Sequence, residues 1–317
     1  MPTQSSTASP TVLKIITPGL HTMVVDQGRP NCRHLGVPVG GAADRFSLAL
    51  GNALAGNIEQ AAALEIAVTG PVVEADADLA CVLFGAPFSL SSDRQELGVG
   101  KTFTLEAGER LQISGTPTGA RGYLCVRGGF QTPLVLGSRS GFAPLQAGAK
   151  LACLSAVNSG RFLHHSFDWN QEPKTLRVTS GLQADWFDLG FFLGQPYEVT
   201  PVSNRMGLRL LGPPLQFPER ELVSEAVGLG SVQVTRNGQC IILGVDGQTI
   251  GGYPKIAQVI SADIDKLGQL RPGDSVRFMK VTVPDAENLF REKQAELDEW
   301  VTRLLETSIC KKSLSPQ

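Results

Sequence analysis

Apolar and polar residues alternate in short runs along most of the chain, and glycine or Gly-Pro pairs separate these runs. A period of two in short segments predicts β-strands joined by tight turns. Three segments, 105–111, 145–151 and 270–276, share the spacing Leu-x-x-Gly-x-x-Leu or Val, which places a glycine turn between two short strands. Because such segments occur in both halves, the pattern predicts two related all-β lobes whose strands close barrels.

Individual elements of the second half can be placed from the same pattern. A short helix is expected near residues 183–192. Strands are expected at residues 176–179, 197–201, 207–211, 232–234, 241–245, 257–261 and 275–281.

Helical spacing of apolar residues occurs in two places. The residues from Phe46 to Leu54 predict a helix that ends at Gly56. From residue 284 onward the apolar residues lie on one face with charged residues opposite, which predicts a C-terminal amphipathic helix. Its apolar face packs on its own protein or, alternatively, on a partner. The face comprises Leu289, Phe290, Leu297, Trp300, Val301, Leu304 and Leu305.

Ionisable and loop-forming residues are densest between Val24 and Asp44, directly before the first predicted helix. The stretch is too irregular for one strand and predicts a long, structured loop with a functional role. Gly40 and Gly41 lead into the helix, so backbone N–H groups there could cradle a small anion. In a purely structural alternative, Asp44 is the N-cap and the glycines are turn formers.

The length of 317 residues predicts two domains rather than one core. With a net charge of −2 the chain has no basic surface, so nucleic-acid binding has no electrostatic support. Residues 1–10 are polar, and no apolar run is long enough to cross a membrane. A disordered leader on a cytoplasmic protein without membrane contact is therefore expected.

Metal, disulfide and phosphate-loop chemistry find little support in the sequence. The six cysteines lie far apart without C-x-x-C spacing, which favours buried free thiols. Consecutive side chains diverge, so His164 and His165 are better explained as linker residues than as metal ligands. Residues 98–102 look like the end of a phosphate loop, but Gln95 stands where its first glycine would be and strand-like residues follow.

A series of motifs runs in order along residues 12–283: GRP and RHLGVP (28–38), GAADRFSLALGNALAGN (41–57), GSRS (137–140), SGLQADWF (180–187), SNRMGLRL (203–210), Ser224-Glu225, and QTIGGYPKIAQVISAD (248–263). Together they resemble the biotin-dependent carboxyltransferase-domain family, which includes the C-subunit of 5-oxoprolinase, KipA-like proteins and allophanate hydrolase subunit 2. The resemblance implies a mainly β fold of two cyclophilin-like β-barrel lobes with short helices and the C-terminal amphipathic helix. The expected lobes are residues 11–156 and 175–283, with a linker at 157–174 and the helix and tail at 284–317.

The resemblance implies that the chain is the C-subunit-like component of an ATP-dependent 5-oxoprolinase complex that opens 5-oxoproline to glutamate. The implied partners are a cyclophilin-like protein similar to the B-subunit and a protein similar to the A-subunit. The sequence has no ATP-binding or biotin-attachment motif, so a partner is expected to supply ATP, or biotin in the alternative. The alternatives are a biotin-dependent carboxyltransferase of the urea carboxylase type and a non-catalytic KipA-like regulator that binds a kinase-inhibitor protein.

Polar residues within or beside the motifs are the candidates for the site. Arginine can grip a carboxylate, while glutamine and tyrosine can orient an amide, which suits a small, planar, amide-like substrate with an acidic group. The pocket is expected between the lobes, where the 29–44 loop meets the 205–207 and 248–253 turns. The catalytic candidates are Glu65, Glu225 and Tyr253. The substrate-binding candidates are Arg29, His34, Gly40, Gly41, Asp44, Arg205, Gln233, Gln248, Gly251 and Gly252; Arg209 and Lys255 are further polar residues of the motifs.

Purely structural alternatives stay open for two of these residues. The sequence also departs from the family pattern at several positions. Glu65 faces solvent if the alternation of its strand holds, and Tyr253 is a packing aromatic if the 248–253 turn is only structural. The family usually has Ser at Gly40 and Met at Ala43, and a longer segment ending in Asp where this chain has 140–149. Gly247 and Ile250 also stand where other residues are expected, so catalytic competence is left open.

Overall fold

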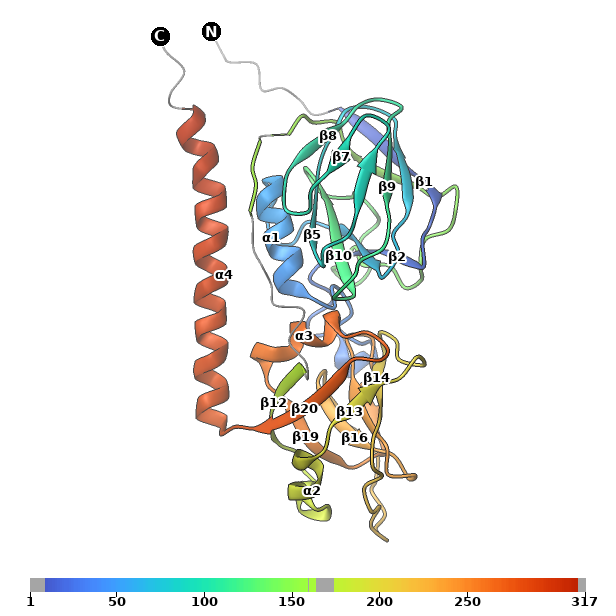
Figure 1. Cartoon of the computed structure of the whole chain (residues 1–317), viewed down its shortest axis with the longest axis vertical. Coiled ribbons are helices and arrows are strands. Elements are labelled where there is room, and N and C mark those ends of the chain that lie inside the picture. Colours follow the sequence, from blue (N-terminus) through green and yellow to red (C-terminus); the bar gives the residue numbers. More distant parts are fainter. Residues whose placement is uncertain (1–8, 159, 164–173, 313–317) are drawn as a thin grey trace. The chain divides into compact units, whose positions relative to one another are not determined.

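The computed structural model describes residues 9–158, 160–163 and 174–312, and for residues 307–312 it describes the backbone only. Strands dominate these residues, with short helices and one long C-terminal helix, as the sequence predicts (Figure 1). The chain divides into two compact units, each built from segments that are distant in sequence. The first unit comprises Met1–Gln27, Arg45–Phe167 and Leu297–Gln317, and the second comprises Gly28–Asp44 and Asp168–Glu296.

Two antiparallel sheets form the first unit. Among the described residues, one sheet has the order β11 (Lys150–Leu154), β1 (Pro10–Thr17), β4 (Val72–Ala75), β9 (Arg110–Ile113), β6 (Leu90–Ser92) and β7 (Glu96–Leu97). The other sheet has, in the same part of the chain, the order β2 (His21–Val25), β3 (Ala63–Ala67), β10 (Arg121–Val126), β5 (Leu79–Gly85) and β8 (Phe103–Leu105). Apolar side chains of both sheets meet in one core, in which Leu13 and Val73 of the first sheet and Leu64 and Leu83 of the second are fully buried. The alternation of the strands therefore places their apolar faces as predicted.

Helix α1, Arg45–Ala55, packs on β5 and β10. It confirms the helix expected after the loop, and Gly56 ends it in the left-handed conformation with φ 79°. Gly51 permits the close approach of helix and sheet, because a Cβ atom there would lie 2.8 Å from Cys125 Sγ and 3.3 Å from Phe84 Cβ.

A closed barrel forms the second unit (Figure 1). Among the described residues its strand order is β12 (Lys174–Ser180), β19 (Lys255–Val259), β16 (Ser231–Val234), β17 (Cys240–Leu243), β14 (Gly207–Leu211), β13 (Tyr197–Val199) and β20 (Ser275–Lys280). The parallel pair β12 and β20 closes it, and Phe192 stacks on Phe278 in its core with ring centroids 4.6 Å apart. Each strand expected in this half is found within a few residues of its predicted limits.

Short elements complete the second unit. β15 and β18 form a separate two-stranded sheet, and a 3-10 turn with a short helix confirms the helix expected near residues 183–192. These elements are β15 (Glu225–Ala226), β18 (Ile250–Gly251), η1 (Arg33–Leu35), η2 (Ala184–Trp186), α2 (Leu189–Gly194), η3 (Ser261–Asp263) and α3 (Ile264–Gln269).

The three repeated glycines all make left-handed turns. Gly108, Gly148 and Gly273 have φ angles of 82°, 84° and 91°. Only Gly108 lies between two strands, β8 and β9; of the described elements, Gly148 has a strand only after it, and Gly273 follows helix α3. The prediction of a strand on both sides is therefore wrong for the last two, because leucine spacing alone does not distinguish a strand from a loop or short helix.

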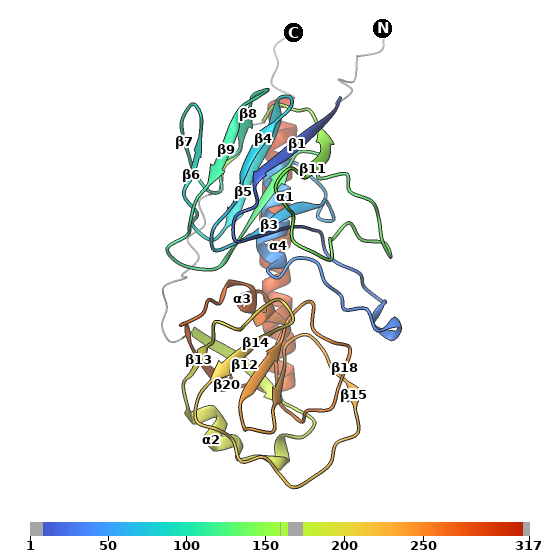
Figure 2. The ribbon, with the colours of Figure 1, turned by 90° about the vertical axis from the view of Figure 1, so that its right-hand side faces the viewer.

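Residues 28–44 belong to the second unit, although the sequence pattern placed them within a first lobe of residues 11–156. The Gly40 N–H donates to the Val245 carbonyl at 2.9 Å, and Gln269 Nε2 donates to Asp44 Oδ2 at 2.7 Å. Figure 2 shows this loop on the same side of the unit as β15 and β18. A segment from the N-terminal half of the sequence is thus part of the barrel unit.

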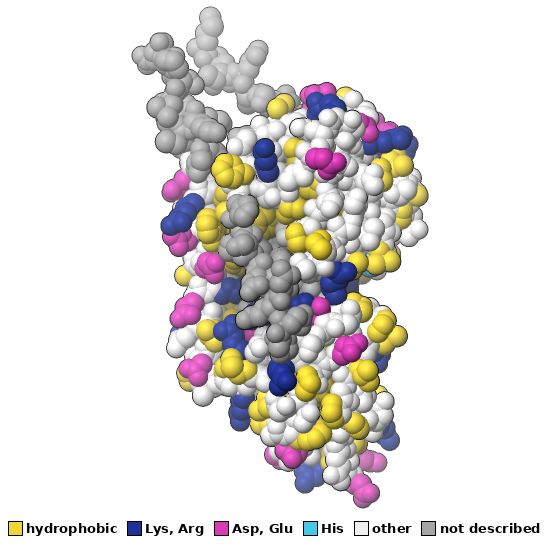
Figure 3. Space-filling model, viewed as in Figure 1, with side chains coloured by type: hydrophobic (Ala, Val, Ile, Leu, Met, Phe, Trp, Pro, Cys, Tyr) yellow, Lys and Arg dark blue, Asp and Glu magenta, His cyan; other side chains and the backbone are white. Residues whose placement is uncertain are grey.

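Helix α4, Val283–Lys312, is the expected amphipathic helix. Leu297 and Leu304 are buried, so this part of the apolar face packs on its own protein, whereas Phe290 and Leu305 of the same face are 40% and 37% exposed. Lys293 Nζ donates to the Ala262 carbonyl at 2.9 Å and to Asp265 Oδ2 at 2.6 Å. Figure 3 shows acidic and basic side chains interspersed on the described part of the face in view. Among the described residues, every helix is too short or too polar to span a bilayer.

Several expectations fall wholly or partly outside the described residues. The leader lies outside up to residue 8, and β1 begins within it at Pro10. Of the 157–174 linker, residues 159 and 164–173 lie outside, including both histidines. Residues 98–102 lead into strand β8, which confirms the strand, in place of a helix, that the sequence predicts after them. Among the described thiols, Cys81, Cys125, Cys153 and Cys240 are free and buried, Cys32 is free but only half-buried, and the Cys310 side chain is not described.

Candidate functional site

Amide, carboxylate and ammonium side chains gather beside the small β15–β18 sheet of the second unit. Backbone pairing sets their positions, since Glu225 of β15 lies opposite Gly251 of β18. Gln233 of β16 lies opposite Lys255 of β19, next to an irregularity in that strand pair. Such an irregularity re-aims side chains out of the regular alternation, which is how polar groups come to lie at the edge of an apolar barrel.

Glu225 is held by a lysine and a glutamine. Its Oε1 atom forms an ion pair with Lys255 Nζ and accepts from Gln183 Nε2 at 2.8 Å. Gln183 Oε1 in turn accepts from the Lys255 backbone N–H at 3.0 Å. The hydrogen bond from Lys255 lowers the pKa of Glu225 below its ordinary value, so this carboxylate is ionised at neutral pH. Its Oε2 atom accepts no hydrogen bond from the described residues and can accept one from a ligand.

Gln233 is the second notable group, because its side chain is 1% exposed and its Nε2 atom has no hydrogen-bond partner among the described residues. A buried amide donor without a partner is uncommon and calls for an explanation such as a bound ligand. A Cβ atom on Gly251 would lie 2.8 Å from Gln233 Nε2 and 3.0 Å from Gln248 Nε2. Both amides therefore converge on a point that stays open only because residue 251 is glycine.

The exposed residues of the 248–253 turn border this cluster. Gln248 is exposed, and Tyr253 retains 37% of its accessible surface. Neither side chain forms a hydrogen bond with the described residues. Tyr253 is thus no core residue, and both are available to a ligand.

The 28–44 loop, which the sequence led us to expect in the other lobe, belongs to this unit and reaches this part of it. Arg33 Nη2 donates to the carbonyl of Val227, whose side chain borders Gly251. On the other side of the loop, Arg205 pairs bidentately with Asp246, at 2.6 and 3.1 Å, and donates to the Gly41 carbonyl at 2.7 Å. Arg205 is therefore already engaged in fixing the loop.

Other predicted residues of the loop have contrasting environments. Arg29 is 2% exposed, and its backbone N–H donates to the Val39 carbonyl at 2.7 Å. A Cβ atom on Gly40 would lie 3.5 Å from Arg29 Nη1 and 3.6 Å from Asp246 Oδ1, so charged groups flank this glycine. Gly41 is buried and His34 is exposed, while Gly252 is exposed in the 248–253 turn.

Glu65 lies in the first unit and does not face solvent, so that alternative is wrong. Its side chain is fully buried on β3, where Tyr123 donates to Oε2 at 2.9 Å and Arg121 Nε lies 3.3 Å from Oε1. Tyr123 is its direct neighbour on β10. Alternation failed here because both faces of this sheet region are covered, α1 packing on β10.

Three polar residues of the cluster were given no role from the sequence: Gln183 and Arg33, which were not named as candidates, and Lys255, which was named only as a further polar residue of the motifs. Each lies within a recognised motif, SGLQADWF, GGYPKIA and RHLGVP, so the motifs carried the signal. The sequence did not show that β16 pairs with β19 and that the loop contacts Val227. These contacts bring the three residues to the same part of the unit.

Known proteins resemble this chain over most of its length. Residues 35–280 match the model of the carboxyltransferase domain, subdomain A and B. The 5-oxoprolinase C-subunit of Escherichia coli is 33% identical over 307 residues, covering 92% of this chain and 99% of that protein. That of Haemophilus influenzae is 34% identical over 288 residues, covering 87% and 93%. The crystal structure of the K. lactis urea amidolyase superposes with a TM-score of 0.83 and 26% identity; it covers 93% of this chain, which spans 20% of that one.

Proposed function

Since the chain belongs to the carboxyltransferase-domain family with subdomains A and B, we propose that it is the C-subunit-like component of an ATP-dependent 5-oxoprolinase complex. The complex opens 5-oxoproline to glutamate, as a hydrolase of the cytoplasm. The two relatives named as the 5-oxoprolinase C-subunit support this choice, because the chain covers nearly their whole length. Its partners are proteins similar to the A-subunit and the B-subunit of that enzyme, and ATP is supplied through them.

The observation that carries the proposal is the pairing of an unpartnered amide donor with an unfilled carboxylate acceptor in one cluster of described residues. A lactam presents a carbonyl oxygen and an N–H group in the same plane. Gln233 Nε2 suits the carbonyl oxygen, and Glu225 Oε2 suits the N–H. Gln248 and Tyr253 line the exposed side and orient the ring.

Opening the lactam adds water across the C–N bond, so that the carbonyl carbon becomes a carboxylate and the nitrogen an amine. A donor that strengthens its hydrogen bond as charge develops on the carbonyl oxygen stabilises that step. Gln233 fills this role, while Lys255 keeps Glu225 ionised and in place. Arg29 remains the proposed partner of the substrate carboxylate, because a guanidinium group matches a carboxylate and Arg29 Nη1 borders Gly40, 3.5 Å from the position of a Cβ atom there.

A second candidate is a biotin-dependent carboxyltransferase acting on urea, favoured by the likeness to the K. lactis urea amidolyase. Urea is also a planar N–C=O compound, so the same donor and acceptor would serve. It lacks a carboxylate, so loss of Arg29 would leave this activity unchanged.

The test reconstitutes the chain with its two cognate partner proteins and measures glutamate formed from 5-oxoproline and ATP. The chain alone should be inactive, and the complex active. Gln233→Leu should lower kcat at least about tenfold, since a hydrogen bond to developing charge is lost. Gln294→Leu, at an exposed position of α4, is the matched control. Turnover by the chain alone, or no turnover by the complex, contradicts the proposal; a binary complex with a kinase-inhibitor protein in place of turnover supports the KipA-like alternative.

A further inference from the structure

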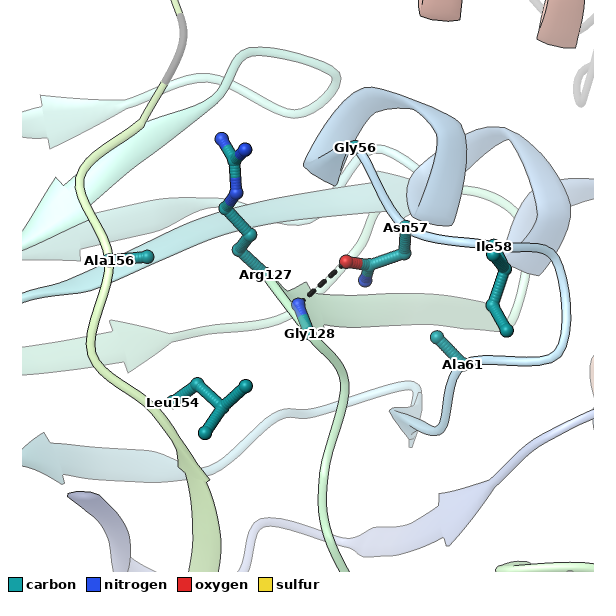
Figure 4. Close-up of a pocket in the computed structure, with 8 residues that line it drawn as sticks. All are labelled: Gly56, Asn57, Ile58, Ala61, Arg127, Gly128, Leu154 and Ala156. Atoms are coloured by element: carbon teal, nitrogen blue, oxygen red, sulfur yellow. Dashed lines mark hydrogen bonds between the residues drawn. The ribbon is translucent and has the colours of Figure 1, made fainter. Parts of the chain in front are cut away.

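A pocket of about 330 Å³ lies in the first unit, at the end of helix α1. Its wall consists of the turn after α1, the two residues after β10, and the end of β11 with the segment that follows it (Figure 4). The volume is at the lower end of the range for small-molecule sites, roughly 300–1,000 Å³. The lining residues are Gly56, Asn57, Ile58, Ala61, Arg127, Gly128, Leu154 and Ala156.

The pocket wall is rigidly built on one side. Asn57 Nδ2 donates to the Val126 carbonyl at 2.8 Å, and its Oδ1 accepts from the Gly128 N–H at 2.7 Å. Figure 4 shows this contact and shows Arg127 extending between the Gly56–Asn57 turn and Ala156. The neighbours of Arg127 are thus fixed by hydrogen bonds, while Arg127 itself is exposed.

A second arginine lies at the edge of the same pocket. A Cβ atom on Gly56 would lie 2.9 Å from Arg161 Nη1, so only glycine leaves room for it there. Arg161 Nη1 donates to the carbonyls of Ala53 and Leu54 at the end of α1, at 3.0 and 3.1 Å. Its Nε atom is buried without a hydrogen-bond partner in the described part of the chain.

The two guanidinium groups are close enough to affect one another. Burial lowers the pKa of Arg161, and the like charge of Arg127 lowers it further. Neither arginine forms an ion pair with a described carboxylate, and no acidic residue lines the pocket. Asp78, whose backbone carbonyl accepts from the Ala156 N–H, directs its carboxylate to the Ala107 N–H instead.

Among the described residues, the guanidinium group of Arg161 has only the two helix carbonyls as partners. A second cation beside it, Arg127, favours an anion between them, and carboxylates match the planar guanidinium group. Apart from the Asn57 amide, which is bonded to the backbone, the remaining lining side chains are apolar, and Ile58 is 72% exposed at the rim. We propose that this pocket binds a small aliphatic carboxylate, with its charged group between Arg127 and Arg161 and its hydrocarbon part on Ile58, Ala61 and Leu154. The site is independent of the cluster in the second unit and of the reaction proposed for it.

The test titrates the full chain with butyrate and measures binding by ligand-observed NMR. Butyrate should bind, whereas the uncharged n-butanol and inorganic phosphate should each bind at least about tenfold more weakly. Arg127→Gln removes the charge and should weaken butyrate binding about tenfold. Ala156→Phe fills the pocket and should do the same with Arg127 intact. Arg236→Gln, at an exposed position of the second unit, is the matched control and should change nothing.

Thermal melts check that each variant is folded. The proposal is overturned if butyrate does not bind the wild-type chain, if phosphate binds as tightly as butyrate, or if both pocket variants bind butyrate like the wild type. A loss of affinity in the Arg236→Gln control equal to that of Arg127→Gln also overturns it, because attraction would then reflect net charge alone.

Discussion

Two polar clusters, one in each unit, contain family motifs but differ in how completely their hydrogen bonds are satisfied. In the first unit, Asp26 accepts from Ser138 Oγ at 2.6 Å, from Ser140 Oγ at 2.7 Å and from the Arg139 N–H at 2.6 Å. In the second unit, the buried Gln233 amide has a donor without a partner among the described residues.

The difference separates two kinds of buried polar residue. A buried carboxylate whose oxygens are engaged stabilises a turn and has little capacity left for a ligand. An unsatisfied buried donor beside a half-exposed carboxylate destabilises the ligand-free protein. A ligand that accepts its hydrogen bond removes this cost. Whether a buried polar group has its hydrogen-bond partners therefore distinguishes positioning residues from binding residues better than membership of a motif does.

The largest expected effect falls on the satisfied cluster. Asp26→Ala should lower the free energy of unfolding by about 3 kcal/mol, because it leaves the buried hydroxyls of Ser138 and Ser140 and the part-buried N–H of Arg139 without their acceptor. Urea denaturation measures the change, with the exposed Asp298→Ala as control. A loss below about 1 kcal/mol would show that Asp26 does not organise the turn.

The unsatisfied cluster should respond in the opposite way. Gln233→Leu should change the free energy of unfolding by less than about 1 kcal/mol, because it replaces an amide that lacks a partner by an apolar group of similar size. Urea denaturation of the Gln233→Leu variant measures this change. A loss as large as that of Asp26→Ala would show that the Gln233 amide is satisfied in solution, and the contrast between the two clusters would disappear.

The smallest expected effect is a shift in titration. Lys255 lowers the pKa of Glu225 in the folded chain, so this pair stabilises the fold above the ordinary pKa of about 4.3, and the contribution is lost as the pH falls through the lower folded value. In Lys255→Met the pKa of Glu225 should rise toward its ordinary range. Carbon-detected NMR of the carboxyl group measures it, and an unchanged value would contradict the assigned ion pair.

The sequence predicted most of the barrel, because strand alternation and glycine turns are local signals. The strands ending in Leu211, Val234 and Lys280, and helix α1 with its terminal Gly56, were all expected close to where they are found. Local signals also placed the strand that holds Gln233, and Glu225 lies in the Ser224-Glu225 motif. These features depend mainly on interactions between residues that are close in sequence.

Contacts between distant segments were not predictable in the same way. The bond from Gly40 to Val245, which ties the loop to the barrel, has no counterpart in the local pattern. The burial of Glu65 depends on Tyr123 and Arg121 of another strand. The role of Lys255 likewise depends on strand pairing, which sequence alternation leaves undetermined.

The most direct test of the central claim observes the Gln233 side-chain amide while the substrate binds. In the reconstituted complex, with only this chain carrying ¹⁵N-glutamine, the Gln233→Leu variant assigns the signal and 5-oxoproline is then added. The account predicts that the Gln233 amide signal shifts and saturates at the concentration that half-saturates turnover, while the exposed Gln294 amide stays in place. A complex that turns over 5-oxoproline with the Gln233 amide signal unmoved would contradict the assignment of this cluster as the substrate site.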